Sequence, residues 1–401
     1  MNYRPRFLSK SQYEVLVLLL VFAISGCGSV PERTPPPAEL KELAEIPGFP
    51  HVRDWGDDSS FIEEYWMSPS DEEIASNYSG VIGSEHTYLA ISGGGANGAY
   101  GAGLLVGWTA AGTRPEFTVV TGISTGALIA PFAFLGSDYD EMLRELYTTL
   151  STDDLIKKRG ILTAITSDAV ASTEPLQAKI AQYVDQRVVD AIAAEFRRGR
   201  HLIIGTTDLD TGRPVDWYIG EIANSDNPNR IDLIHKVLLA SASIPGVFPP
   251  VLIGAEYEGQ HFDEMHVDGG VVTQAFFYSF TTDWNIISER LEVKGRPTMY
   301  MIRNSRVNPA RTTIEPTLLS ITERSISLLI LNQGVGDIFY MASLAERDDI
   351  DLNLAYIPDD FEIEENELFD PVYMQALFDL GYHNAKEGNP WLNVLNEINK
   401  Y

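Results

Sequence analysis

The sequence is poor in cysteine and in positive charge, and each shortage excludes a class of protein. Its single cysteine, Cys27, excludes an intramolecular disulfide in a chain of 401 residues. Lysine and arginine number 29 against 57 aspartates and glutamates, which gives a formal net charge of −28. A chain this acidic should repel nucleic acid, because phosphate binding needs clustered cations. It should also repel anionic lipid headgroups, unless something else holds it at a membrane.

Histidine is scarce too, and its placement favours neither a metal site nor a catalytic motif. None of the seven histidines lies in a motif that marks a catalytic histidine, and no Cys/His cluster or EF-hand spacing occurs. We therefore expect no metal and no cofactor. His383 alone has the late position that a Ser…Asp…His order requires, in the stretch "DLGYHNAKEG", which is typical of a helix surface.

What the chain does have begins at its N-terminus. Three basic residues in the first ten precede an apolar run at 15–23, which has signal-peptide length and is too short to span a bilayer. The sequence Ile-Ser-Gly-Cys at 24–27 follows and resembles the lipobox of bacterial lipoproteins. That resemblance implies cleavage after residue 26 and lipidation of Cys27, which would anchor the protein to a membrane. Gly28, in place of aspartate, favours the outer over the inner membrane of a bacterial envelope.

The rest of the chain divides by composition. Residues 1–26 are the predicted signal peptide, and 27–50 are a lipid anchor followed by a proline-rich, semi-rigid spacer. An acidic, aromatic arm covers 51–85, the main domain covers 86–390, and 391–401 form a C-terminal tail. No internal repeat is found.

The main domain alternates predicted strands and helices. "HTYLAIS" and "EFTVV" are typical of buried strands, and each is followed by a glycine-containing turn and a small, apolar helix. Longer helices are predicted over 174–198, 316–347 and 371–387. This order predicts an α/β fold with a parallel sheet and crossover helices.

A serine flanked by glycines follows the second predicted strand. In "VVTGISTGAL", Gly122 and Gly126 stand two residues before and after Ser124. This pattern fits a nucleophile elbow, a sharp strand-to-helix turn that needs small neighbours and places the hydroxyl beside a helix N-terminus. The β-rich run before the serine and the apolar helix after it favour Ser124 as a nucleophile over a plain tight turn.

A glycine-rich loop, "SGGGANG" at 92–98, follows the first predicted strand. Its N–H groups at a helix start could stabilise either a dinucleotide pyrophosphate or an oxyanion. A dinucleotide site needs an acid at the end of the next strand, where this chain has "VVTGIS". We therefore predict an oxyanion hole and no nucleotide, with close helix–sheet packing as the structural alternative. The predicted residues are Gly93, Gly94, Gly95, Ala96 and Gly98.

An aspartate followed by two glycines supplies a candidate base. In "HVDGG", Asp268 ends a predicted strand and precedes Gly269 and Gly270. Open α/β folds place their sites at the carboxyl ends of strands, although a plain Asp-Gly turn is common.

Together these motifs resemble the patatin-like phospholipases. The order and spacing of the glycine-rich loop, the GxSxG elbow and the distant Asp-Gly-Gly carry the resemblance, as does "ASASIPGVFPPV" at 240–251, and it covers about 86–275. It implies a three-layer α/β/α fold with a central, mostly parallel sheet. It also implies lipid ester hydrolysis by a Ser124–Asp268 dyad through an acyl-enzyme, with the oxyanion held around Gly94, Gly95 and Ala96.

One residue departs from the family pattern. Asn97 stands where the family usually has arginine or lysine in the glycine-rich loop. The change leaves backbone N–H groups in place but favours neutral glycerides, lysolipids or other esters over anionic headgroups.

The sequence thus predicts a membrane-anchored serine acyl hydrolase of phospholipase A or lysophospholipase type. Two alternatives remain, a catalytically weak envelope lipoprotein with a binding role and a Ser-Asp-His esterase that uses His383. The apolar runs "LIAPFAFLG" and "SIPGVFPPVLIG" either line an acyl groove or belong to the core.

Overall fold

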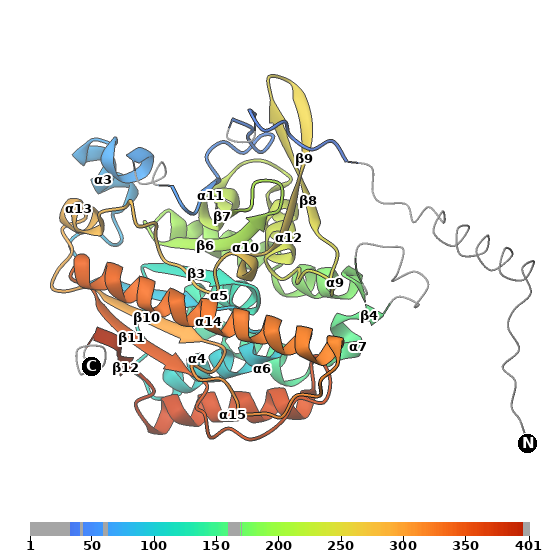
Figure 1. Cartoon of the computed structure of the whole chain (residues 1–401). Coiled ribbons are helices and arrows are strands. Elements are labelled where there is room, and N and C mark those ends of the chain that lie inside the picture. Colours follow the sequence, from blue (N-terminus) through green and yellow to red (C-terminus); the bar gives the residue numbers. More distant parts are fainter. Residues whose placement is uncertain (1–32, 41–42, 59–62, 159–168, 170, 396–401) are drawn as a thin grey trace, which may run out of the picture.

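The protein is described by a computed structural model that covers residues 33–40, 43–58, 63–158, 169 and 171–395. The predicted signal peptide and Cys27 lie outside the described residues, so they remain predictions. Figure 1 shows the arrangement of the elements.

The centre of the domain is a sheet whose five middle strands run parallel, in the spatial order β6–β3–β2–β10–β11. These strands are β2 (Thr87–Ile91), β3 (Val119–Ile123), β6 (His201–Asp208), β10 (Thr298–Arg303) and β11 (Asp351–Tyr356). Antiparallel strands extend both edges: β7 (Arg213–Tyr218) and β1 (Arg53–Trp55) beyond β6, and β12 (Leu392–Asn393) beyond β11. The predicted mostly parallel sheet is confirmed.

Helices cover both faces of the sheet, because successive side chains of each strand point to opposite faces. In β2, Leu89 and Ile91 face one apolar cluster and Tyr88 and Ala90 face the other. The first cluster is covered by α4 (Gly98–Ala110), α5 (Thr125–Leu135), α6 (Asp140–Thr148), α10 (Gln186–Phe196), α11 (Ile219–Asn224), α12 (Arg230–Ser241) and α15 (Pro371–Glu387). The second is covered by α3 (Asp71–Asn77), α13 (Trp284–Arg290) and α14 (Leu318–Arg347). The predicted three-layer α/β/α fold is therefore confirmed.

The register on β6 brings two chain segments end to end. β3 pairs with β6 as far as Ile123, which lies opposite Gly205. The next residue of β6, Thr206, lies opposite Asp268 at the end of β9 (Gln260–Asp268). β9 forms a long hairpin with β8 (Val251–Tyr257). The residue that follows β3 and the last residue of β9 therefore meet at one point of the sheet.

Three predicted segments differ from the structure in detail. The helix predicted over 174–198 is two helices, α9 (Glu174–Tyr183) and α10, because Asp185 accepts hydrogen bonds from Arg187 N and Val188 N and so begins a new helix. In the predicted spacer, Ile46 and Phe49 are buried and Glu45 pairs with Glu256 of β8. The predicted arm contributes β1 to the sheet and buries Trp66 and Tyr78. The remaining short elements are α7 (Thr152–Leu155) and the pair β4 (Lys157–Lys158) and β5 (Ala171–Ser172), which forms a separate two-stranded sheet.

Candidate active site

Ser124 occupies a strained turn between β3 and α5. Its φ of 56° lies in the left-handed region, which is unusual for a residue with a side chain. The flanking glycines make the turn possible: a Cβ at Gly122 would lie 2.5 Å from the carbonyl oxygen of Gly126, and one at Gly126 would lie 2.3 Å from that of Ile91. The structure thus gives the predicted GxSxG elbow its steric reason, and the strain is of the kind that persists at functional sites.

Asp268 lies directly against the serine. Ser124 Oγ donates a hydrogen bond to Asp268 Oδ2 at 2.5 Å, and Asp268 Oδ1 accepts one from Gly270 N at 2.8 Å. Both side chains are buried, with relative exposures of 6% for Ser124 and 5% for Asp268. Burial raises the pKa of Asp268 to about 6, although the hydrogen bonds from Ser124 and Gly270 partly oppose this shift. A carboxylate with this pKa is a better base at neutral pH than an exposed aspartate.

The glycine-rich loop lies beside the serine and opens into the short helical turn Gly95–Asn97 at the start of α4. Gly93 N already donates to Gln274 O, and Gly98 N donates to carbonyls within its own turn. These two N–H groups are therefore occupied, which leaves the N–H groups of Gly94, Gly95 and Ala96 as the candidate donors of the predicted oxyanion hole. A Cβ at Gly98 would lie 2.1 Å from Thr125 Oγ1, so this glycine allows α4 to pack against the elbow.

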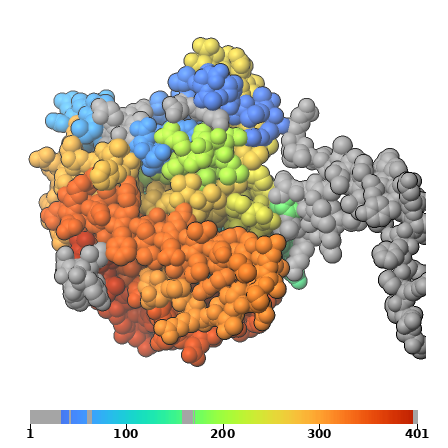
Figure 2. All heavy atoms as spheres, in the orientation of Figure 1, coloured from blue at the N-terminus to red at the C-terminus, as the bar shows by residue number. Residues whose placement is uncertain are grey.

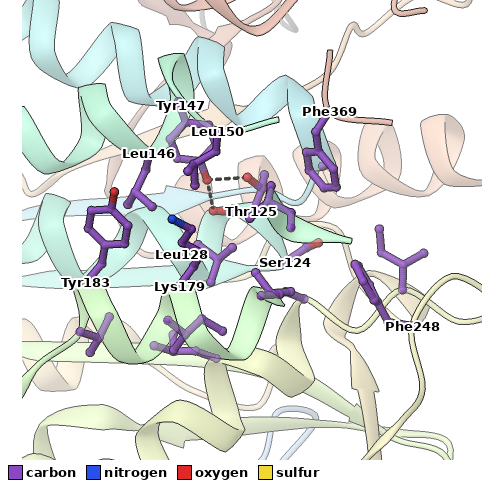
Figure 3. Close-up of a pocket in the computed structure, with 18 of the residues that line it drawn as sticks. Ser124, Thr125, Leu128, Leu146, Tyr147, Leu150, Lys179, Tyr183, Phe248 and Phe369 are labelled. Atoms are coloured by element: carbon purple, nitrogen blue, oxygen red, sulfur yellow. Dashed lines mark hydrogen bonds between the residues drawn. The ribbon is translucent and has the colours of Figure 1, made fainter. Parts of the chain in front are cut away.

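Two cavities meet at the serine. One is an apolar pocket beside the elbow, which Figure 3 shows with Ser124 near Phe248 and Phe369, and with Tyr183 on the side away from the serine. Its lining includes Leu128, Phe132, Ile244 and Phe248 from the two apolar runs noted in the sequence. Other residues of those runs, such as Ile129 and Phe134, belong to the core. The runs therefore contribute both to this pocket and to the core, and Phe132 and Phe248 belong to both.

The second cavity is a wider cleft that opens to the surface. It shares Gly95, Ser124 and Ile244 with the apolar pocket and is also lined by Asp268. Polar side chains line it, among them Asn97, Asn304, Arg303, Arg306 and Arg324. Asn97 Oδ1 accepts a hydrogen bond from Tyr373 OH at 2.6 Å, so the residue that departs from the family pattern is fixed by α15.

The histidines stand apart from this centre. All seven lie within the described residues, and none lines either cavity that contains Ser124. His383 is exposed on α15, where its Nδ1 lies 2.6 Å from the carbonyl oxygen of Asp379 in the same helix, and it lines a separate hollow. The structure therefore brings Asp268, and not His383, to the serine.

Three supporting residues were not predicted from the sequence. Ser241, the last residue of α12, accepts a hydrogen bond from Ser124 N and donates one to Gly205 O, which fixes the elbow. Asn304 donates from its backbone N to Ser92 Oγ and from Nδ2 to Ser92 O, and so holds the start of the glycine-rich loop. Gln274 links that loop to the Asp-Gly-Gly turn, because its carbonyl accepts from Gly93 N and its Nε2 donates to Gly270 O. The only sequence signal for any of them is the small-residue stretch at 240–251.

Comparison with known proteins now identifies the domain. The family described as "Patatin-like phospholipase" matches residues 89–279. The chain carries a patatin-like phospholipase domain. The match begins within β2 and ends after the Asp-Gly-Gly turn, so it contains the loop, the elbow and Asp268. The family resemblance predicted from the sequence is confirmed, and the domain is that of a lipid acyl hydrolase family.

Other comparisons add little to the patatin-like domain. No curated protein matches the chain. Among solved structures, VipD from Legionella pneumophila is similar over 76% of this chain and 66% of its own length, with 12% identity and a TM-score of 0.36. The chain thus spans slightly less than two thirds of that protein.

Proposed function

We propose that this protein is a membrane-anchored serine acyl hydrolase that cleaves ester bonds of lipids, of phospholipase A or lysophospholipase type, through a Ser124–Asp268 dyad. The observation that carries the proposal is the 2.5 Å hydrogen bond from Ser124 Oγ to Asp268 Oδ2 in a strained elbow at the meeting point of two cavities. The patatin-like domain at 89–279 belongs to a lipid acyl hydrolase family, which also supports hydrolysis of lipid esters.

The geometry gives each group a role in acyl transfer. Asp268 accepts the hydroxyl proton as Ser124 Oγ attacks the ester carbonyl carbon, and the N–H groups of Gly94, Gly95 and Ala96 stabilise the oxyanion. Collapse of the tetrahedral intermediate breaks the bond to the alcohol, which leaves with the proton held by Asp268. Water then attacks the acyl-enzyme carbonyl as Asp268 takes its proton. The ester bond to Ser124 breaks, Asp268 returns the proton to Ser124 Oγ, and the carboxylic acid is released. The apolar pocket would hold the acyl chain, and the polar cleft the alcohol part of the substrate.

A fluorophosphonate probe tests the dyad on the full chain. We expect Ser124→Ala to abolish labelling and Asp268→Asn to slow it by roughly 10²–10⁴-fold, because the base that activates the nucleophile is lost. His383→Ala is the matched control and should label like the wild type. An unlabelled wild type would favour the binding lipoprotein. Loss of labelling in His383→Ala, with Asp268→Asn unaffected, would replace the dyad by the histidine-dependent esterase.

The membrane anchor is the finer part of the proposal, and it rests on the sequence at 24–28. A lipidated Cys27 would hold the acidic chain at the bacterial envelope, at the outer rather than the inner membrane. We expect Cys27→Ala to leave an unprocessed or soluble protein, as read by mass and by membrane fractionation. Gly28→Asp should keep the processed mass but shift the protein toward the inner membrane. If Cys27→Ala changed neither mass nor fractionation, lipidation would be refuted.

A further inference from the structure

The N-terminal half of α14 leaves large apolar side chains in solvent. No residue of 318–333 is buried, and Gly334 is the first buried position of the helix. Leu318, Leu319 and Leu329 are 86%, 77% and 71% exposed. Together with Ile321, Ile326 and Ile330, which are also exposed, they form what we call the α14 apolar surface. In Figure 2 the orange atoms of this helix lie across the front of the molecule.

Charged side chains are few in α14 and lie mostly near its ends: Glu323 and Arg324 in its second turn and Glu346 and Arg347 in its last. Between 325 and 345 the only charged side chain is Asp337, and it is turned toward the domain, where it accepts hydrogen bonds from Gln274 N and Ala275 N. Within the described part of the chain, α14 is the one helix long and apolar enough to cross a membrane by length and composition. Yet 33% of an apolar 18-residue stretch of this helix is buried against the domain. A helix held in this way can lie on a bilayer but not span it.

The α14 apolar surface is continuous with the mouth of the candidate active site. Ile326, Leu329 and Ile330 line the same cleft as Ser124 and Asp268. Val271, three residues after Asp268, is also exposed and lines this cleft. Whatever covers the surface therefore meets the entrance to the site.

The inner side of the same helix holds the loops of the site. Gln333 Oε1 accepts a hydrogen bond from Gln274 Nε2 at 3.0 Å, and Asp337 Oδ2 accepts one from Gln274 N at 2.6 Å. Gln274 in turn contacts Gly93 and Gly270 on the two loops that flank Ser124. Gln274 therefore links α14 directly to the two loops that flank Ser124.

We propose that the α14 apolar surface docks the domain onto a lipid bilayer, with the active-site cleft facing the membrane. A bilayer is the occupant that fits a surface with large apolar side chains and few charges on a chain of net charge −28, because docking then depends on apolar burial. A second copy of the chain would instead cover the cleft entrance. The choice of a bilayer rests on the proposed lipid substrate, whereas the docking itself needs no catalysis.

Depth-dependent quenching tests the docking directly. A fluorophore is attached to Leu319→Cys in the full chain carrying Cys27→Ser and Ser124→Ala, and phosphatidylcholine vesicles contain lipids with a quencher in their acyl chains. The control site is Ala194→Cys on α10, which is exposed on the opposite layer of the fold. Any contribution of the apolar run at 15–23 is common to both variants. We expect several-fold stronger quenching at 319 than at 194, and equal or absent quenching at 319 would overturn the proposal.

A paired activity measurement separates docking from chemistry. Leu318→Asp with Leu319→Asp should lower hydrolysis of a vesicle-embedded ester, by about tenfold for each leucine removed from the bilayer. Hydrolysis of a soluble short-chain ester should be unchanged, since neither residue lines the cleft. Leu209→Asp, an exposed leucine at the β6–β7 turn, is the matched control and should change neither rate. An equal loss on both substrates, or a dimer that these substitutions dissociate without any quenching at 319, would refute bilayer docking.

Discussion

Asp268 combines two requirements that oppose each other, since it must be ionised to act as a base yet its side chain is buried. Burial raises its pKa to about 6, and only the ionised form can accept the proton of Ser124. We therefore expect kcat/KM for a soluble ester to be constant above about pH 6 and to fall tenfold per pH unit below it. A rate profile measured with a short-chain ester checks this. A plateau that extends to pH 4.5 would mean that the carboxyl has an ordinary pKa.

The same shift makes Asp268 a cost to stability at neutral pH. Its pKa is higher in the folded than in the unfolded chain, so the fold favours the protonated carboxyl. The stability that this protonated form contributes is complete below the unfolded pKa of 3.8 and is lost as the pH rises through about 6. We expect Asp268→Asn to raise the free energy of unfolding at pH 7.5 by up to about 3 kcal/mol, the equivalent of about two pKa units. Thermal melting of both chains at pH 7.5 and pH 4 gives the measurement. The gain should shrink at the lower pH, and a variant that melts earlier at pH 7.5 would contradict the argument.

At the residue scale, the sequence predicts the functional residues that are marked by their near neighbours in the chain. Ser124 and Asp268 could be predicted because each is followed or flanked by glycines close in the sequence, although the atoms that require Gly126 and Gly269, the carbonyl oxygens of Ile91 and Gly205, are distant in the chain. Ser241 and Gln274 could not, since each acts through a hydrogen bond to a residue more than a hundred positions away. Likewise, the sequence does not reveal that Gly93 N is unavailable to an oxyanion, because it donates to a distant acceptor, Gln274 O.

At the element scale, α4 and α15 pack backbone against backbone. A Cβ at Gly103 would lie 2.0 Å from the carbonyl oxygen of Phe378, and one at Gly107 would lie 2.2 Å from that of Tyr382. These atoms belong to the backbone and cannot move aside without separating the helices. α15 also carries Tyr373, so this packing positions the residue that binds Asn97.

Substituting glycines in two helices tests this packing. We expect Gly103→Ala to lower the free energy of unfolding by at least about 2 kcal/mol, because the new methyl group meets the backbone of α15. Gly336→Ala in α14 is the matched control, as a Cβ there meets nothing within 4 Å. It should stabilise the chain by up to about 1 kcal/mol through helix propensity. Chemical denaturation measures both, and equal effects of the two substitutions would show that propensity rather than packing decides.

Element boundaries could be predicted where an end is marked by local chemistry. The predicted helix at 371–387 coincides with α15, whose start is fixed by Pro371 and by the cap Asp370. The break at Asp185 was missed because apolar residues continue on both sides of it. The attachment of Arg53–Trp55 to β7 could not be predicted either, since the pairing joins residues far apart in the chain.

At the scale of the whole molecule, the net charge of −28 and the apolar surface of α14 act in opposite directions at a membrane. Repulsion from anionic headgroups acts over a Debye length, which is about 30 Å at 0.01 M salt and about 8 Å at 0.15 M. Apolar burial does not depend on salt in this range. The balance between the two therefore changes with ionic strength only when the membrane is itself charged.

We accordingly expect salt to promote hydrolysis on anionic membranes. The rate on an ester embedded in phosphatidylglycerol-containing vesicles should rise several-fold from about 0.01 M to about 0.15 M salt, as the repulsion is screened. The rate on pure phosphatidylcholine vesicles should stay constant, and a soluble ester controls for salt effects on the chemistry itself. Arg303, Arg306 and Arg324 line the active-site cleft, where their charges are opposite in sign to the net charge of the chain. A rate on anionic vesicles that falls with salt would mean that these three cations, rather than the net charge, govern the approach to the membrane.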